Sequence, residues 1–342
     1  MVDCIYFPIF NQDFFKTDRT QIILFISHKN GILDGENFMT KKIIKKFKRS
    51  LARRTYYFFF WLFSILPLKF VFAISNLLIS MAFPFLIGMR KYAKESLTIA
   101  FEKEKSEKEI DQILRACFFN LGRGAIEMFC YVQRPWLISE KLHLNAEARQ
   151  NLDNALKENK GVVGVSAHLG NFPLMLLYLA KIGYPINAVI RPGRDAKIEQ
   201  SFQEQRAKLG LKTIHSYPRE ICVRQSLKAL RAYELVTILM DQNTGSASGI
   251  FVDFFGKKAC TPSGAVIFAM RTGSPFLPIF TVRDGKDSHK IIIEPHFYIE
   301  EKASDEETLH HNVQKITRII EKYIRQYPQE WSWMHRRWKS HH

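Results

Sequence analysis

The residue of this sequence that is best placed for acid–base chemistry is His168, which directly follows the apolar run GVVGVSA at 161–167. A Gly-Asn turn comes next, and a helical pattern begins at about Pro173. A neutral imidazole there can take a proton from an alcohol or an amine, because its unperturbed pKa lies near the working pH. Backbone N–H groups of the turn and of the helix start can face negative charge that develops on a thioester oxygen. A purely structural histidine is the alternative, and these residues alone do not decide between the two.

A second chemically active candidate, Asp241, closes the apolar run LVTILM at 235–240. A carboxylate at the end of a buried strand is costly unless it is paired or functional. If the two apolar runs are neighbouring parallel strands, Asp241 and His168 emerge at the same edge of the sheet. Gln242 follows directly and is a candidate to bind a substrate oxygen. The alternative is a solvated aspartate in a loop.

Two arginines are candidates for anion binding. Arg191 ends a third apolar run, INAVIR at 186–191, and its forked guanidinium suits a phosphate or an anionic headgroup. Arg206 lies fifteen residues further along in a helical pattern and adds a second candidate, although for Arg206 alone a surface salt bridge is the simpler interpretation.

The C-terminal segment PQEWSWMHRRWK at 328–339 combines three tryptophans with His335 and several basic residues. Tryptophan together with arginine is typical of membrane–water interfaces. A stacking surface for nucleic acid is the alternative, but no nucleic-acid motif accompanies it.

The elements that must position these residues alternate between strands and helices. We expect strands at 161–167, 186–191, 235–240, 276–282 and 289–294. Helical patterns cover 107–131, 173–182, 196–209, 218–232, 263–272 and 308–327. This alternation predicts an α/β fold with a largely parallel or mixed sheet flanked by helices.

The N-terminal part has a different character and predicts a membrane-associated helical segment. Residues 41–54 carry eight basic residues and no acid, and Ile43, Ile44, Phe47 and Leu51 share one helical face. A basic amphipathic helix suits an anionic membrane surface, and a solvated charged helix is the alternative. From Tyr56 to Met89 the only charge is Lys69, and 70–89 is long enough to cross a hydrocarbon core. Pro67, Asn76 and Pro84 interrupt the region, so one span, a hairpin in one leaflet and an interfacial helix pair all remain open.

Three regions follow from these patterns. Residues 1–38 are a leader of uncertain status, since Met39 is a possible start and a weakly ordered leader the alternative. Residues 39–95 are the basic and hydrophobic membrane anchor, and 96–342 form the catalytic domain.

The overall charge points to an anionic partner. Lys and Arg number 50 against 33 Asp and Glu, a surplus of +17. Such a surplus fits nucleic acid, a phospholipid surface or a phosphorylated substrate. The uncharged run at 70–89 argues against nucleic acid. None of the five cysteines forms a CxxC pair, so we expect neither a zinc site nor a redox motif, and no metal.

From about Met39 to its end, the chain resembles the lipid A biosynthesis acyltransferases, the late acyltransferases that use an acylated carrier protein. The matches occur in the family's order and spacing: HLGNF at 168–172, Arg191–Pro192, Asp241–Gln242, FVDFFGKKACTPSGA at 251–265, RTGSP at 271–275 and PQEWSWMHRRWK at 328–339.

The chain departs from the family at one position. The family has an aspartate or glutamate five residues after the histidine, where this sequence has Pro173. Proline cannot orient an imidazole, although its fixed φ suits the first turn of a helix. Asp241 is our candidate for the missing acid, ahead of Glu127 and Asp195.

The resemblance implies an activity and a location. The activity is transfer of a fatty acyl chain from acyl carrier protein, or acyl-CoA, to a hydroxyl of a membrane glycolipid, a lipid A precursor. It places the enzyme at the cytoplasmic face of the inner membrane, with no cofactor beyond the acyl donor. His168 and Asp241 would be catalytic, and Asn171, Arg191, Arg206 and Gln242 would bind substrate. The alternative, prompted by Pro173, is a catalytically impaired membrane lipid-binding homologue.

Overall fold

The centre of the protein is a seven-stranded sheet. The computed structural model describes residues 33–193, 195–244 and 249–340. In sheet order the strands are β1 (Leu142–Leu144), β9 (Ser288–Ile293), β8 (Phe276–Asp284), β2 (Val162–Ser166), β5 (Leu235–Leu239), β3 (Ile186–Ile190) and β4 (Lys212–His215). All neighbours are parallel except β8 and β9. The predicted α/β class is confirmed, and so are the five predicted strands, while the short edge strands β1 and β4 were not predicted.

Helices cover both faces of this sheet. The predicted helical patterns correspond to α4 (Glu107–Gln133), α7 (Phe172–Lys181), α8 (Ala196–Lys208), α9 (Arg219–Arg231), α10 (Gly264–Thr272) and α11 (Asp305–Gln326). Further elements are α5 (Pro135–Lys141), α6 (Ala146–Lys157), the 3-10 turn η5 (Pro328–Glu330) and the hairpin β6 (Gly249–Phe254) and β7 (Lys257–Pro262), against which α11 packs.

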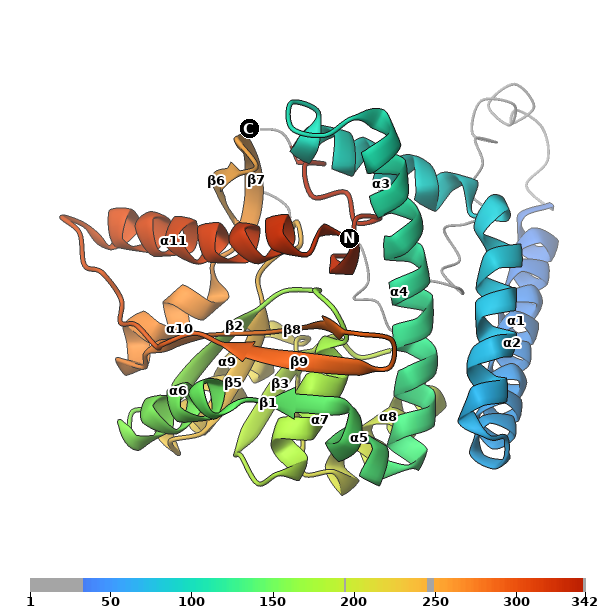
Figure 1. Cartoon of the computed structure of the whole chain (residues 1–342), viewed down its shortest axis with the longest axis horizontal. Helices are drawn as coiled ribbons and strands as arrows, with labels where there is room; N and C mark the ends of the chain where they lie inside the picture. Colours follow the sequence, from blue (N-terminus) through green and yellow to red (C-terminus); the bar gives the residue numbers. More distant parts are fainter. Residues whose placement is uncertain (1–32, 194, 245–248, 341–342) are drawn as a thin grey trace.

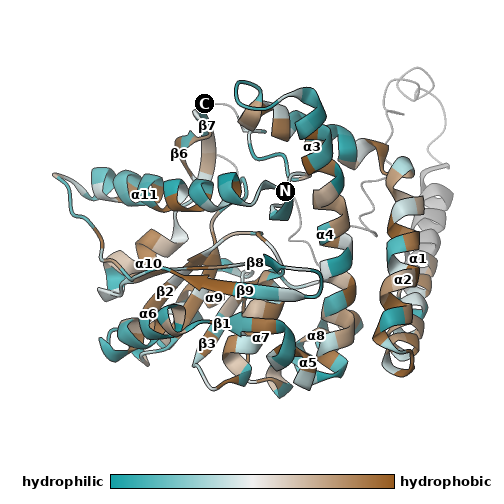
Figure 2. Ribbon diagram, in the orientation of Figure 1, coloured by the Kyte–Doolittle hydropathy of each residue, from teal (hydrophilic) through white to brown (hydrophobic). Residues whose placement is uncertain are grey.

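The apolar strands point alternate residues into two separate cores. Val163 and Val165 of β2 pack with the buried residues of α10 and α11, whereas Val162 packs with those of α6 and α7. A strand that is buried on both faces has a nearly continuous apolar sequence. This explains why polar and apolar residues do not alternate in β2, β3 and β5. Figure 2 shows the hydrophobic colour concentrated in these central strands.

The long helix α4 separates the sheet from the N-terminal helices (Figure 1). It begins with a capping box, in which the side chain of Ser106 accepts from the Glu109 N–H and the Glu109 carboxylate accepts from the Ser106 N–H. On its outer side lie α1 (Leu33–Ile65) and α2 (Leu68–Ala82), which are joined at Leu66 and Pro67. Ile79 of α2 lies so close to Gly122 of α4 that a Cβ on that glycine would meet it at 2.7 Å.

The uncharged run 70–89 is not one continuous helix, and the number of membrane crossings stays open. It is divided into α2, the 3-10 turn η4 (Phe83–Phe85) and the start of α3 (Ile87–Phe101). Pro84 has no N–H to continue the α-helical bonding, and Leu86 leaves helical geometry at ψ 41°. By length and composition, Leu68–Phe85 is apolar enough to cross a membrane, and only 17% of it is buried. The 15 residues of α2 rise about 22 Å, less than the roughly 30 Å of a hydrocarbon core.

The proposed regions of the chain remain predictions. Residues 1–32 of the leader lie outside the described residues, and so do the side chains of Ile43 and Ile44 on the predicted amphipathic face. Residues 33–38 and 41–54 all belong to α1, and Phe47 and Leu51 are exposed. The boundary after residue 95 falls within α3.

Candidate active site

His168 and Asp241 form a buried pair at the carboxyl edge of the sheet. In the parallel register of β2 and β5, Ser166 lies opposite Leu239, and each candidate follows two residues later. Asp241 Oδ1 is 2.9 Å from His168 Nδ1, and Asp241 Oδ2 accepts the His168 backbone N–H at 3.0 Å. The predicted contact is therefore present, while the catalytic role of the two residues stays a prediction. Because the carboxylate accepts from Nδ1–H, the imidazole lone pair is on Nε2.

Asp241 is held as a carboxylate by three donors. Besides the two groups of His168, Trp331 donates its Nε1–H to Oδ2 at 2.7 Å. Burial raises the pKa of Asp241, but the charge of His168 and the hydrogen bonds from His168 and Trp331 outweigh burial and lower it to about 2. The group is thus ionised at neutral pH and can stabilise an imidazolium.

The tryptophan-rich C-terminal segment is part of the core, which corrects its interpretation as an interfacial or nucleic-acid surface. Trp331 and Trp333 are fully buried, with their rings 4.6 Å apart and edge to face. Trp331 and Leu169 form an isolated antiparallel β-bridge, and the Ser332 N–H donates to the His168 carbonyl at 3.3 Å. The segment therefore clamps the turn that carries His168.

The turn itself is fixed by Gly170, whose φ is +57°. A Cβ there would lie 2.1 Å from the Thr281 carbonyl oxygen, so no other residue fits. The Gly170 N–H donates to the Glu330 carbonyl at 2.9 Å, and the His168 N–H is taken by Asp241. These two N–H groups of the turn already have acceptors. The backbone N–H groups expected to bind an anion are therefore those at the start of α7.

Pro173 occupies the first turn of α7 and contributes no polar group. The preceding Phe172 packs edge to face on the His168 ring, with centroids 5.1 Å apart. The helix therefore begins as the sequence predicts, and its first turn orients the imidazole by an aromatic contact.

Asn171 ties the same turn to α4. Its amide Nδ2 donates to the Gly124 carbonyl at 3.1 Å and to Glu127 Oε2 at 3.3 Å. The side chain is buried, so these contacts indicate a structural brace, and its predicted role in substrate binding stays untested.

Glu127, a weaker candidate for the acid, does not contact His168. It is fully buried and accepts from Arg283 Nη1 at 2.7 Å, from His289 Nε2 at 2.8 Å and from Arg123 Nε at 3.2 Å. Burial raises its pKa, but His289 and Arg283 outweigh burial and lower it to about 2. The other weaker candidate, Asp195, caps α8 by accepting the Lys197 and Ile198 N–H groups.

The two anion-binding candidates differ in their surroundings. Arg191 directly follows β3 at the same edge of the sheet as His168 and is half-buried. Arg206 is almost fully buried and donates to Glu199 Oε1 at 2.6 Å. Glu199 Oε2 also accepts the Gly193 N–H at 2.8 Å, so Arg206 braces the loop after Arg191 through Glu199. This pairing favours a buried structural salt bridge for Arg206 over direct substrate contact.

Two further residues adjoin the pair. Gln242 is half-buried, and its Nε2 has no hydrogen-bond partner within the described part of the chain. His335 is buried, and its Nε2 accepts the Asn243 N–H at 2.8 Å, which places its proton on Nδ1. Burial, with a smaller contribution from His168, lowers the pKa of His335 to about 4, so it is neutral at pH 7. Neither His335 nor Trp331 was predicted in the site, because 90 residues separate Trp331 from Asp241 in the sequence.

No group of three or more His, Cys, Asp or Glu side chains that could hold a metal ion occurs among the described residues. The arrangement places a histidine, the ionised carboxylate that pairs with it and a cationic side chain at one sheet edge. Such groups suit proton removal from a hydroxyl that attacks an activated carbonyl.

The chain is similar to proteins of one family. It matches the family described as bacterial lipid A biosynthesis acyltransferase over residues 44–340. A lipid A biosynthesis palmitoleoyltransferase of Escherichia coli is 24% identical over 290 residues, which cover 82% of this chain and 88% of the relative. A lipid A biosynthesis lauroyltransferase of the same organism is 24% identical over 288 residues, covering 82% and 89%. A lipid A biosynthesis acyltransferase of Haemophilus influenzae is 21% identical over 235 residues, covering 68% and 69%.

Proposed function

Because the chain belongs to the bacterial lipid A biosynthesis acyltransferase family, we propose that it transfers a fatty acyl chain to a hydroxyl of a lipid A precursor. The donor is acyl carrier protein, with acyl-CoA as the second possibility, and the acceptor is a membrane glycolipid. The observation that carries the proposal is the buried His168–Asp241 pair, at 2.9 Å, within the HLGNF segment.

The geometry supports a direct mechanism. His168 Nε2 removes the proton from the acceptor hydroxyl as its oxygen attacks the thioester carbonyl carbon. The carbonyl reforms as the C–S bond breaks, and the imidazolium returns the proton to the thiolate that leaves. Asp241 keeps the Nδ1 proton in place and stabilises the transient positive charge. No oxidant, reductant or metal is needed to balance this reaction.

Asp241 supplies the carboxylate that the family has at the position of Pro173. The base needs one acceptor at Nδ1, and Asp241 Oδ1 already fills that position. A carboxylate at 173 is therefore not required to set the tautomer. This supports an active enzyme over the catalytically impaired lipid-binding homologue.

The N-terminal helices support a membrane location, which we place at the cytoplasmic face of the inner membrane. Phe70, Leu77 and Met81 of α2 are each at least 60% exposed, and Phe85 of η4 is 76% exposed. Large apolar side chains exposed together mark a surface that contacts lipid or protein. We expect the full chain to sediment with membranes and to require detergent for release. Its recovery in a salt-washed soluble fraction would contradict this location.

The proposal is tested by mass spectrometry of the acceptor after incubation with purified full-length protein in detergent. The reaction contains acyl carrier protein loaded with a fatty acid and a lipid A precursor with a free hydroxyl. We expect the acceptor mass to rise by one acyl group with the wild type and to stay unchanged with His168→Ala. A matched control, His296→Ala, removes a half-buried histidine that lies 3.8 Å from Glu158, and it should keep wild-type activity. Equal product from His168→Ala would refute the proposed base.

A further inference from the structure

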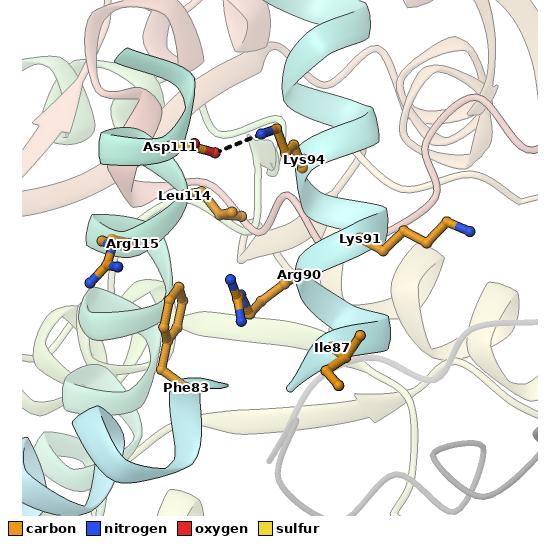
Figure 3. A pocket seen from close by; sticks show the side chains of 8 residues that line it. All are labelled: Phe83, Ile87, Arg90, Lys91, Lys94, Asp111, Leu114 and Arg115. Carbon is orange, nitrogen blue, oxygen red and sulfur yellow. Dashed lines mark ion pairs between the residues drawn. The ribbon is translucent and has the colours of Figure 1, made fainter. Parts of the chain in front are cut away.

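A basic cavity lies apart from His168, between α3 and α4. Its volume is about 320 Å³, and its walls come from η4, the first half of α3 and the first turns of α4 (Figure 3). Four basic side chains and a single acid line it. The acid, Asp111, is paired with Lys94 at 3.0 Å, and Lys94 also binds Glu107 at 2.8 Å. The remaining charges of the lining are therefore positive.

Two of these charges lie against one aromatic ring. The Arg90 Cζ lies 4.5 Å and the Arg115 Cζ lies 5.4 Å from the centroid of Phe83, and the two groups stand on either side of the ring in Figure 3. Phe83 is itself fixed edge to face against Phe118, with centroids 5.4 Å apart. Two positive charges against one ring make the potential there positive, which favours an anion that both guanidinium groups can reach.

Neither arginine is neutralised by a carboxylate in the described part of the chain. Arg90 Nε is buried without a hydrogen-bond partner there, and Nη1 reaches only the Pro84 carbonyl, at 3.4 Å. A forked guanidinium with unused donors matches the oxygens of a phosphate. In Figure 3 Lys91 points away from the other basic groups, and Lys94 is paired with Asp111, so Arg90 and Arg115 are the lining cations that remain for an anion.

The cavity opens beside the apolar surface that we assign to the membrane. Met81, Phe85 and Ile87 are 60%, 76% and 71% exposed, and all three lie within four residues of Phe83 in the chain. If these apolar side chains lie in lipid, the arginines directly beside them lie at the depth of the lipid phosphate groups. This position favours a phosphate that is attached to a lipid over one that is free in solution.

The cavity is also separate from the active site. Asn171 of the His168 turn reaches α4 at Gly124, whereas Arg115 lies nine residues earlier on that helix. Nine residues correspond to about 14 Å along an α-helix and to about two and a half turns, so Arg115 and Gly124 face opposite sides of α4.

We propose that Arg90 and Arg115 bind the phosphate of an anionic membrane phospholipid in this cavity. The site is distinct from the one that binds the acceptor, and it fixes the depth and orientation of the enzyme at the membrane surface. It uses the membrane location assigned above but does not depend on acyl transfer.

The test measures lipid retention by full-length protein in a neutral detergent. The protein is titrated with phosphatidylglycerol, phosphatidylcholine or inorganic phosphate, and bound lipid is counted by mass spectrometry of the intact complex. The cavity variant is Arg90→Gln/Arg115→Gln. The control variant, Lys103→Gln/Lys108→Gln, removes two nearby exposed charges that do not line the cavity.

We expect the wild type and the control variant to retain phosphatidylglycerol at least tenfold more tightly than phosphatidylcholine. The cavity variant should lose that preference, since each charged hydrogen bond lost weakens binding by about tenfold or more. An unchanged preference in the cavity variant, or an equal loss in the control variant, would overturn the proposal. Competition by inorganic phosphate at the same concentration as the lipid would also overturn it, because the site would then bind free phosphate.

A second readout separates this site from the acceptor site. In micelles without anionic phospholipid, the KM of the cavity variant for the acceptor should equal the wild-type value. A raised KM would show that the cavity holds the acceptor instead and would overturn the proposal. If neither the wild type nor any variant transfers an acyl chain, the proposed function fails. The lipid-retention measurements still decide whether the cavity binds a phospholipid.

Discussion

Replacing Asp241 by asparagine should invert the tautomer of His168 as well as remove a charge. Asp241 Oδ2 accepts two N–H groups, from the His168 backbone and from Trp331, while Oδ1 accepts only the imidazole Nδ1–H. Asparagine has one acceptor oxygen and one NH₂ group, which only donates. Its oxygen should take the position of Oδ2, where it satisfies two donors, so its NH₂ faces Nδ1. Nδ1 must then accept, and the proton moves to Nε2, where the base can no longer take a proton.

The expected loss follows from this inversion. A positioned general base contributes about 10²–10⁴-fold to a rate, so kcat/KM should fall by that factor. The fold should be destabilised only moderately. The pKa of Asp241 falls from 3.8 to about 2 on folding, which corresponds to about 2 kcal/mol. Because the folded pKa is lower, this stabilisation is present above pH 3.8 and is lost as the pH falls towards 2.

Two measurements check the Asp241→Asn variant. The acyl-transfer assay gives kcat/KM, and ¹⁵N NMR of the histidine rings reports which nitrogen of His168 carries the proton. The reasoning predicts Nδ1–H in the wild type and Nε2–H in the variant. A folded variant with kcat/KM within threefold of the wild type would refute the role of Asp241, whichever tautomer it shows.

Three further outcomes are expected. Pro173→Ala should change kcat/KM by less than about threefold, and Pro173→Glu should not raise kcat/KM, because Asp241 already accepts from His168 Nδ1. A clear gain in kcat/KM from Pro173→Glu would show that position 173 acts as it does in the family. Arg191→Ala should lower kcat/KM by about ten- to a hundredfold with little change in the urea midpoint, the loss of one charged hydrogen bond to substrate, and unchanged kinetics would mark the arginine as structural. Glu127→Gln should cost about 3–5 kcal/mol in free energy of unfolding at pH 7, because it leaves buried cations unpaired. Since folding lowers the pKa of Glu127 from 4.5 to about 2, that difference should narrow as the pH falls below 4.5, and a difference independent of pH would contradict the ion-pair account.

The parts of the fold that the sequence predicts are those governed by local patterns. Continuous apolar runs identify β2, β3 and β5, and parallel neighbours end at one edge, so the approach of Asp241 to His168 could be predicted before the structure. The family predicted from the ordered motifs is confirmed by the match over residues 44–340. Edge strands such as β4, with four residues and a partly polar sequence, carry too weak a pattern to identify.

The contacts that the sequence does not predict are long-range and polar. Tryptophan next to arginine suits both a membrane interface and a buried core, and only the return of the chain after α11 places Trp331 on Asp241. Arg206 and Arg191 are both arginines that the sequence offers for anion binding. Only the structure shows that Arg206 pairs with Glu199 of the same helix, α8. The interruption of the uncharged run could be foreseen from Pro84, but the turn it makes into α3 depends on packing against α4.

The most direct test of the central claim is the lipid profile of a deletion strain. We expect its lipid A to lack one acyl chain, and we expect the wild-type gene to restore that chain while the His168→Ala gene does not, at equal protein level. A deletion strain with unchanged lipid A, or restoration by His168→Ala, would contradict the account.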